Sequence, residues 1–148
     1  MLISPKIIIG FLIFILFLHI SAIINYWYWI YIWFDIPMHF LGGFWVAMIC
    51  IWLNSKFNII ETRPPNVYRN FWRSDLPKLI LVLGFVALIG VFWEFFEFFY
   101  DVFISNRGYF GFLQLGAADT LSDLFFDFLG GLAFMVIILI SRRRTSED

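Results

Sequence analysis

Four long apolar stretches dominate this sequence, and the third of them contains acidic residues. Residues 92–101, FWEFFEFFYD, place Glu94, Glu97 and Asp101 inside a run that is otherwise hydrophobic. On a helix these three positions are three and four residues apart, so they share one face. Carboxylates at bilayer depth are energetically costly and usually face a bundle interior or a wet cavity. The chain therefore has to fold so that this acidic face finds partners.

The composition is that of an integral membrane protein. Of the 148 residues, 62% are hydrophobic, 23% are aromatic and only 14% are charged, which lies outside the range of soluble domains. The single cysteine, Cys50, excludes an internal disulfide framework. The basic residues lie in predicted loops and near the chain ends, so no nucleic-acid partner is indicated. The lipid bilayer is the expected partner, and the sequence indicates no oligomeric state.

We expect an all-α, polytopic membrane protein with four transmembrane helices in a single domain, residues 1–148. The helices are predicted at about 7–24, 36–53, 78–103 and 120–140, since each run is long enough to span the hydrocarbon core. A signal peptide is the competing interpretation of the first run, but no clear cleavage site follows it. Residues 26–34, YWYWIYIWF, are predicted to form an interfacial belt, with a short amphipathic or re-entrant segment as the alternative.

Positive charge is concentrated on one predicted side of the membrane. With four spans, nine of the ten Lys and Arg residues fall on that side, and only Arg107 falls on the other. Because basic loops remain cytoplasmic, we expect a multi-pass protein of the cell (inner) membrane with both termini in the cytoplasm. The nine residues are Lys6, Lys56, Arg63, Arg69, Arg73, Lys78, Arg142, Arg143 and Arg144.

Small residues mark the helix faces that are predicted to pack. Glycine and alanine at these positions let neighbouring backbones approach closely. On the third helix the small residues are predicted to lead along one face into Glu94 and Glu97. The predicted contact positions are Gly42 or Gly43 and Ala47 on the second helix, Gly84, Ala87 and Gly90 or Val91 on the third, and Gly130 or Gly131 on the fourth.

With this topology, the unusual polar residues of all four helices fall in the outer half of the membrane. At 1.5 Å per residue, His39, Glu94 and Asp127 would lie roughly 6 to 13 Å below the outer boundary. So many acids cannot all remain ionised in a low dielectric unless a cation neutralises them. The complete set is His19, Asp35, His39, Glu94, Glu97, Asp101, Asp119, Asp123 and Asp127.

We predict that part of this set surrounds one outward-opening cavity that holds a divalent metal ion, Zn, Mn or Mg. Histidine with carboxylates is a common ligand set for such ions, and helix bundles build metal sites from facing helices. The predicted ligands are His39, Glu94, Glu97, Asp123 and Asp127, of which Glu94 and Glu97 are also the candidate catalytic residues.

The remaining polar residues are predicted to support the ligands, and each also has a simpler interpretation. Asp35 and Asp119 each precede a predicted helix, where an N-cap is the simplest role. Asp101 is interpretable as an interfacial residue, and His19 as a residue that packs helix against helix.

Three motifs resemble those of known membrane families. They are Asp35-x-x-x-His39-Phe-x-x-Gly43-Phe, Trp93-Glu94-x-x-Glu97-Phe and Asp119-Thr120-x-x-Asp123-x-x-x-Asp127-x-x-Gly130. Over residues 34–131 the chain resembles the bacterial inner-membrane proteins of the YjdF/DUF2238 type. A looser pattern is similar to VanZ-like proteins, which are linked to teicoplanin resistance. Those typically carry Gln where Glu97 stands and Asn near Asp127, which favours the first family. Neither resemblance implies a particular reaction.

Three functions fit these features. The first is a metal-dependent membrane hydrolase or transferase acting on a lipid-linked or envelope substrate, with Glu94 or Glu97 as general base. The second is a proton or divalent-cation transporter or channel, although the uncharged inner half of the membrane offers no polar path. The third is a structural or accessory membrane protein in which the polar cluster sets helix register.

Overall fold

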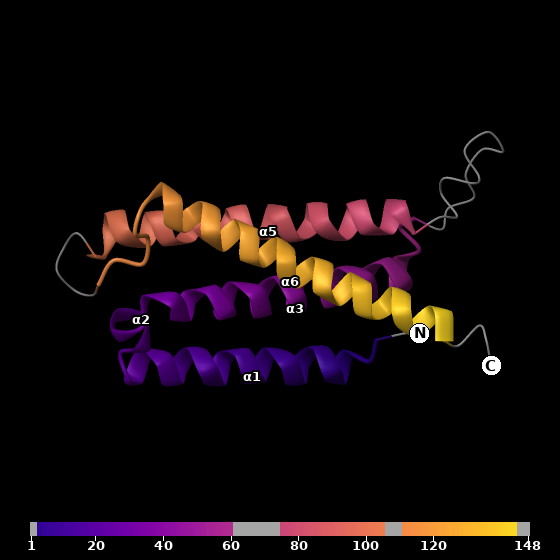
Figure 1. Ribbon diagram of the computed structural model, residues 1–148, viewed down its shortest axis with the longest axis horizontal. Coiled ribbons are helices and arrows are strands. Elements are labelled where there is room, and N and C mark those ends of the chain that lie inside the picture. Colours follow the sequence, from indigo (N-terminus) through magenta and orange to yellow (C-terminus); the bar gives the residue numbers. More distant parts are fainter. Residues whose placement is uncertain (1–2, 61–74, 106–110, 145–148) are drawn as a thin grey trace.

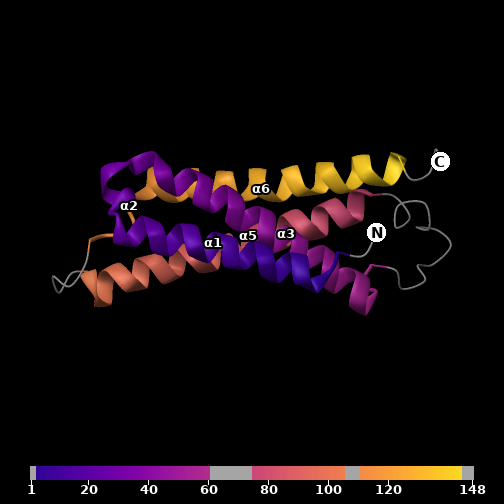
Figure 2. The ribbon, with the colours of Figure 1, turned by 90° about the horizontal axis from the view of Figure 1, so that it is seen from below.

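The computed structural model describes residues 3–60, 75–105 and 111–144, with side chains described as far as Ser141. Four long helices run along the long axis of the molecule (Figure 1 and Figure 2). A short helix, α2, and a 3-10 turn, η1, join the first two of them, and the described ranges contain no strand. The predicted all-α fold is therefore confirmed. The elements are α1 (Pro5–Ile24), α2 (Trp27–Ile30), η1 (Ile32–Phe34), α3 (Asp35–Phe57), α5 (Leu76–Phe103) and α6 (Ala117–Arg144).

All four long helices are long and apolar enough to cross a membrane. Their candidate spans have mean hydropathies of 3.0, 1.8, 2.5 and 2.4 in chain order. A helix is the expected form for such runs, because in lipid each backbone N–H and C=O must be paired within the segment. The start of α1 and the end of α6 lie at one end of the molecule, and α2 lies at the other (Figure 1). The four predicted spans are thus confirmed, whereas their orientation across the membrane stays a prediction.

The observed helices extend beyond several predicted ends. α3 continues past the predicted end at residue 53 to Phe57, and Asn58 ends it in the left-handed region with φ 51°. The side chain of Asn54 accepts a hydrogen bond from the backbone N–H of Ile60 at 3.2 Å. This bond ties the chain beyond the helix back onto its last turn, and residues 54–57, for which the sequence predicts a loop, are helical.

Neither Asp35 nor Asp119 is an N-cap, so that interpretation is wrong. Asp35 is itself helical, because η1 runs directly into α3 and leaves no extended residue at the junction. α6 begins earlier than predicted, at Ala117, so Asp119 lies within its first turn. There the Asp119 carboxylate accepts the backbone N–H of Leu115 at 2.9 Å.

The closest helix contact is between α3 and α6. A Cβ atom added at Gly43 of α3 would overlap the backbone of Asp127, and one added at Gly130 of α6 would overlap the Phe40 carbonyl. At Gly131 an added Cβ would stand 2.9 Å from a methyl group of Val86 on α5. The predicted contacts at these glycines are confirmed, and they explain how three polar helix faces come so close together.

The first half of the predicted α5 face is wrong. Gly84 is exposed, and a Cβ added there would meet no described atom within 4 Å. The buried face instead follows Val82, Val86 and Gly90 into Glu94. In a helix of 3.6 residues per turn, residues three or four positions before Glu94 can share its face. From Val82 to Glu94 the buried residues of α5 are spaced by four, so the buried face turns gradually around the helix. This matches the oblique crossing of α6 over α5 (Figure 1).

α1 lies at the edge of the bundle and packs mainly on α3. Trp45 Nε1 donates to the Ile8 carbonyl at 3.0 Å, and the rings of Phe11 and Phe44 lie 5.4 Å apart. The apolar core lies between α3, α5 and α6, with the start of the chain against it. Its buried members are Ile3, Ile8, Val46, Ala47, Met48, Cys50, Ile51, Val82, Val86, Phe134, Met135 and Ile138.

Candidate metal centre

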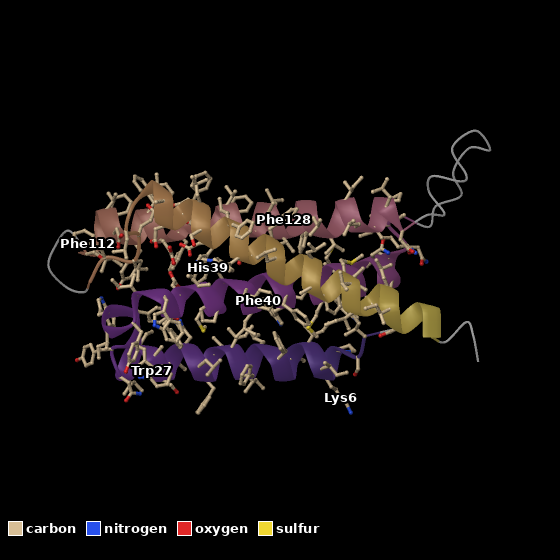
Figure 3. All side chains as sticks on the ribbon, in the orientation of Figure 1. Lys6, Trp27, His39, Phe40, Phe112 and Phe128 are labelled. Atoms are coloured by element: carbon tan, nitrogen blue, oxygen red, sulfur yellow. The ribbon has the colours of Figure 1, made fainter. Side chains whose placement is uncertain are left out.

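The polar cluster is centred on His39, which is 6% exposed. His39 lies in the half of the molecule that carries Trp27 and Phe112, away from the end that carries Lys6 (Figure 3). An imidazole in this position is enclosed by α3 and α6, and its polar atoms must find partners from the same elements. Three aspartates supply them.

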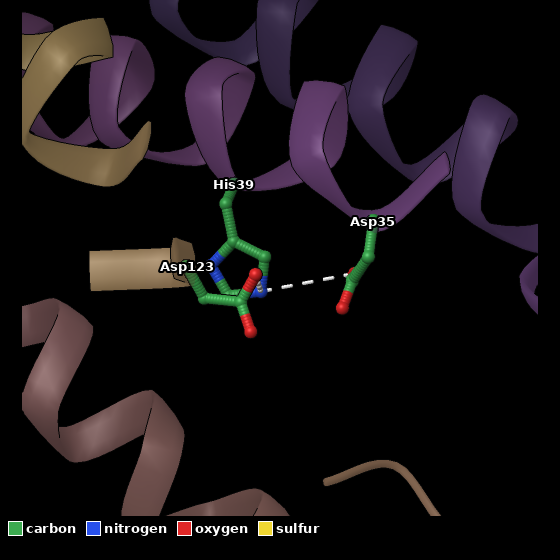
Figure 4. A group of neighbouring side chains, drawn as sticks. All are labelled: Asp35, His39 and Asp123. Atoms are coloured by element: carbon green, nitrogen blue, oxygen red, sulfur yellow. Dashed lines mark ion pairs between the residues drawn. The ribbon is translucent and has the colours of Figure 1, made fainter. Parts of the chain in front are cut away.

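Both ring nitrogens of His39 face carboxylates. Nε2 lies 3.7 Å from Asp35 Oδ1 and 3.9 Å from Asp123 Oδ1, and Nδ1 lies 3.5 Å from Asp127 Oδ2. One ligand atom from each of Asp35, His39 and Asp123 can be chosen so that all lie within 4.8 Å of one another (Figure 4). That spacing matches a set of groups able to surround one cation.

Helix periodicity and the close contact between α3 and α6 explain this geometry. Asp35 and His39 are four residues apart on α3, and Asp123 and Asp127 are four apart on α6, so each pair shares a face. Glycine provides the space for Asp127: a Cβ added at Gly90 of α5 would stand 2.7 Å from its Oδ2. Three helices thus meet at this carboxylate.

Glu94 and Glu97 are buried on the facing side of α5, at 5% and 6% exposure. Glu94 Oε2 accepts from Gln114 Nε2 at 3.2 Å, and Glu97 Oε1 accepts from Trp93 Nε1 at 2.9 Å. Both glutamates lie close enough to Asp35 for their charges to interact. They are not part of the tight group formed by Asp35, His39 and Asp123.

Three carboxylate oxygens in this region are buried and have no hydrogen-bond partner among the described residues. They are Glu94 Oε1, Glu97 Oε2 and Asp123 Oδ2. A buried, unpaired acceptor costs about 1 to 3 kcal/mol, and more when it is charged. A bound cation, or a proton, at these atoms would relieve that cost.

Asp101 and Asp119 have a different role, because both bind the segment between α5 and α6. Asp101 accepts from Ser105 Oγ and from the backbone N–H groups of Leu113 and Gln114, all at 2.9 to 3.1 Å. Asp119 accepts from Leu115 as described above. The structure places these two acids beside the predicted ligands but uses them to hold backbone.

His19 does not reach the cluster itself. Its Nδ1 lies 2.7 Å from the hydroxyl of Tyr28 in α2. Burial raises the pKa of the Tyr28 hydroxyl, and the nearby charges of Asp35 and Glu97 raise it further. Tyr28 therefore lies between the histidine of α1 and the acidic residues of α3 and α5.

Gln114 and Tyr28 make polar contacts, to Glu94 and His19 respectively, that are not predictable from the sequence. Both lie in connections between long helices, where no periodic pattern assigns a side chain to a face. The one available signal for Gln114 is its position as a lone polar residue in the stretch GFLQLG, residues 111–116. Tyr28 is hidden among the aromatic residues of the predicted interfacial belt.

By fold and by site, the chain is a polytopic helical membrane protein with a buried His–carboxylate cluster between three of its helices. Its sequence matches the family described as Predicted membrane protein (DUF2238) over residues 2–144, and the protein belongs to that family. The resemblance to the YjdF/DUF2238 type is therefore confirmed, whereas the similarity to VanZ-like proteins stays a prediction. No curated protein and no solved structure matches the chain.

Proposed function

We propose that the protein is a metal-dependent membrane enzyme, a hydrolase or transferase that acts on a lipid-linked substrate. The observation that carries the proposal is the group formed by Asp35, His39 and Asp123, whose ligand atoms lie within 4.8 Å of one another. Two carboxylates and one imidazole on buried helix faces are a suitable ligand set for Zn, Mn or Mg. Of these ions, Mg prefers oxygen ligands, so its binding would rely least on the histidine.

The roles of the two α6 aspartates differ in this proposal. Asp123 offers a ligand atom on the Nε2 side of His39, together with Asp35. Asp127 lies on the Nδ1 side, where a carboxylate fixes the orientation of a metal-binding imidazole. We therefore assign Asp35 as a ligand and Asp127 as the group that orients His39, which exchanges the roles that the sequence had suggested.

The number of ligands supports catalysis. Three protein ligands leave coordination positions open, as in catalytic metal sites. A bound metal would supply an activated water or polarise a phosphoryl oxygen. Glu94 and Glu97 each have a buried oxygen without a described partner, so either is suited to accept a proton as general base.

The position of the cluster supports a substrate with a lipid anchor. His39 lies towards the end of the bundle that carries Trp27, in the aromatic segment formed by α2 and η1 (Figure 3). Tyr and Trp residues favour the head-group region of a bilayer. A substrate held in the membrane by its lipid would present its head group at this depth.

A cation or proton transporter is the alternative, supported by the same unpaired carboxylate oxygens. Transport requires a route through the other half of the membrane. In the described residues that half is filled by the apolar core between α3, α5 and α6. The side chains of this core are aliphatic, aromatic or sulfur-containing, and Asn54, a buried polar residue at the end of α3, already accepts a hydrogen bond from the Ile60 N–H. The enzyme is therefore the better supported of the two proposals.

Metal analysis and an activity assay test the proposal. Protein purified in mild detergent should contain about one equivalent of Zn, Mn or Mg, and Asp123→Asn should contain little. Asp75→Asn is the matched control, because Asp75 is an exposed acid just before α5. Wild-type protein without metal, or with metal equal to that of Asp123→Asn, would disprove the metal centre.

The activity assay uses vesicles containing a polyprenyl diphosphate. The wild type should release phosphate from this lipid only with its metal, and Glu94→Gln should lose most of that activity while retaining its fold. Metal-dependent cation flux without turnover of the lipid would instead favour the transporter.

A further inference from the structure

The segment before α6 is held in place by acidic side chains. Three consecutive residues in it donate their backbone N–H groups to carboxylates. Leu113 and Gln114 donate to Asp101 at 2.9 to 3.1 Å, and Leu115 donates to Asp119 at 2.9 Å. Together these bonds tie three successive residues of the segment to side chains of the two flanking helices. The backbone at Gln114 is therefore fixed from both α5 and α6.

From this backbone the side chain of Gln114 reaches the candidate metal centre. Its Nε2 lies 3.2 Å from Glu94 Oε2 on α5 and 3.1 Å from Thr120 Oγ1 on α6. A primary amide has two N–H donors, and this arrangement uses both. Gln114 is thus the point at which the connecting segment contacts a buried acid of the cluster.

The amide decides which Glu94 oxygen remains available. Oε2 is occupied by Gln114, whereas Oε1 is buried and has no described partner. An amide is neutral, so it orients the carboxylate without cancelling its charge, as a lysine or arginine would do. Glu94 lies one turn of α5 beyond Gly90, where α5 contacts the Asp127 carboxylate, and the proposed ligand Asp123 lies one turn from Asp127 on α6.

We infer that Gln114 is a positioning residue that orients Glu94 toward the cation site and thereby increases metal affinity. This inference rests on the proposed metal centre. The competing explanation is that Gln114 only fastens the segment before α6, through its second bond to Thr120. The two explanations differ in one respect: positioning requires the Glu94 carboxylate, and fastening does not.

A double-mutant cycle separates them. The four proteins are wild type, Gln114→Met, Glu94→Met and the double variant, because methionine keeps the length of both side chains and removes their hydrogen bonds. Each is measured twice in detergent: thermal unfolding without metal, and binding of Mn²⁺ by equilibrium dialysis. Thr120→Val is the control, since it removes the other partner of the amide and leaves Glu94 intact.

Gln114→Met should weaken Mn²⁺ binding roughly tenfold, the typical loss when a group supporting a metal site is removed. In the Glu94→Met background the same change should have no further effect, and Thr120→Val should bind as wild type does. Without metal, the double variant should lose less melting temperature than the sum of the losses in Gln114→Met and Glu94→Met.

The possible failures are distinguishable. An equal loss of Mn²⁺ affinity with and without the Glu94 carboxylate, or an equal loss in Thr120→Val, overturns positioning and leaves the metal centre standing. Absence of Mn²⁺ binding in the wild type overturns the proposed function. The metal-free unfolding cycle then decides whether Gln114 and Glu94 interact. Additive melting-temperature losses in that cycle would overturn the coupling between Gln114 and Glu94 itself.

Discussion

Gly43 of α3 lies so close to Asp127 of α6 that a Cβ atom at position 43 would overlap the Asp127 backbone. The contact is made by main chain, so no repacking of side chains can relieve it. It lies one turn from His39 and Asp123 on their respective helices. The distance between the two helices, and therefore the spacing of the proposed ligands, is set at this glycine.

Gly43→Ala should destabilise the protein strongly. The added methyl group forces α3 and α6 apart, and overpacking of this kind costs about 3 kcal/mol. Gly84→Ala is the matched control, because Gly84 is also helical but a Cβ there would meet no described atom within 4 Å. Alanine is the better helix former by about 1 kcal/mol, so this variant should be unchanged or slightly more stable. Thermal unfolding in detergent measures both.

The same pair of variants also tests the corrected α5 face. If Gly84→Ala melted far below wild type, the side of α5 that carries Gly84 would be in a helix contact after all. If Gly43→Ala melted like wild type, the close approach of α3 and α6 would be wrong.

Asp35→Asn and Asp127→Asn should differ in their effect on bound metal. Asp35 supplies one atom of the group within 4.8 Å, so its amide variant should lose metal almost completely on dialysis. Asp127 contacts the other nitrogen of His39 at 3.5 Å, so its loss should weaken binding by roughly tenfold to a hundredfold. Dialysis against Zn²⁺ or Mn²⁺ buffers measures the ratio, and the reverse order of affinities would exchange the two assignments.

Tyr28→Phe should remove the link between α2 and His19 of α1. Loss of the 2.7 Å hydrogen bond should cost about 1 kcal/mol at neutral pH, seen as a lower melting temperature. His19→Phe should give a similar loss, and the double variant should lose little more than either single one. Fully additive losses would mean that the two side chains stabilise the protein separately.

The stability difference between wild type and Tyr28→Phe should depend on pH. Burial raises the Tyr28 pKa above its ordinary value of 10.0. The favourable contribution of the protonated hydroxyl is therefore complete below pH 10.0 and is lost as the pH rises toward the folded-state pKa. As the pH rises above 10.0, the melting temperature of wild type should fall more steeply than that of Tyr28→Phe. Parallel curves would show that Tyr28 does not contribute to alkaline unfolding.

Cysteine labelling tests the predicted orientation. Leu115→Cys and Ile59→Cys place thiols at exposed positions, 64% and 50% exposed, beyond opposite ends of the spans. A membrane-impermeant maleimide should label position 115 in intact cells and position 59 only after permeabilisation, because the basic residues predict cytoplasmic termini. The native Cys50 is buried and gives little background. The opposite labelling pattern would invert the protein in the membrane.

Helix periodicity was sufficient to predict the acidic face of α5. Glu94, Glu97 and Asp101 are all buried, as their spacing of three and four residues required. The same rule failed toward the start of α5, where Gly84 was predicted inside and Val82 is buried instead. Over several turns, residues spaced by three and residues spaced by four come to lie on different faces of the helix. Which of the two faces is buried depends on the angle at which α6 crosses α5.

The distinction between ligands and supporting acids was not available from periodicity. Asp101 and Asp119 share helix faces with the cluster, but their carboxylates bind backbone N–H groups of residues 113–115. Such contacts depend on the path of a connecting segment, which carries no periodic signal. For the same reason the contact between Gln114 and Glu94 is not predictable from periodicity.

The position of the Asp127 carboxylate over Gly90 has a consequence for how this family can vary. A Cβ at position 90 would occupy space that Asp127 Oδ2 now fills, at a separation of 2.7 Å. Residue 90 and residue 127 are therefore not independent: relatives with a bulkier residue at position 90 should have a smaller or differently placed one at 127. In an alignment of the family the two positions should covary, although 37 residues separate them along the chain.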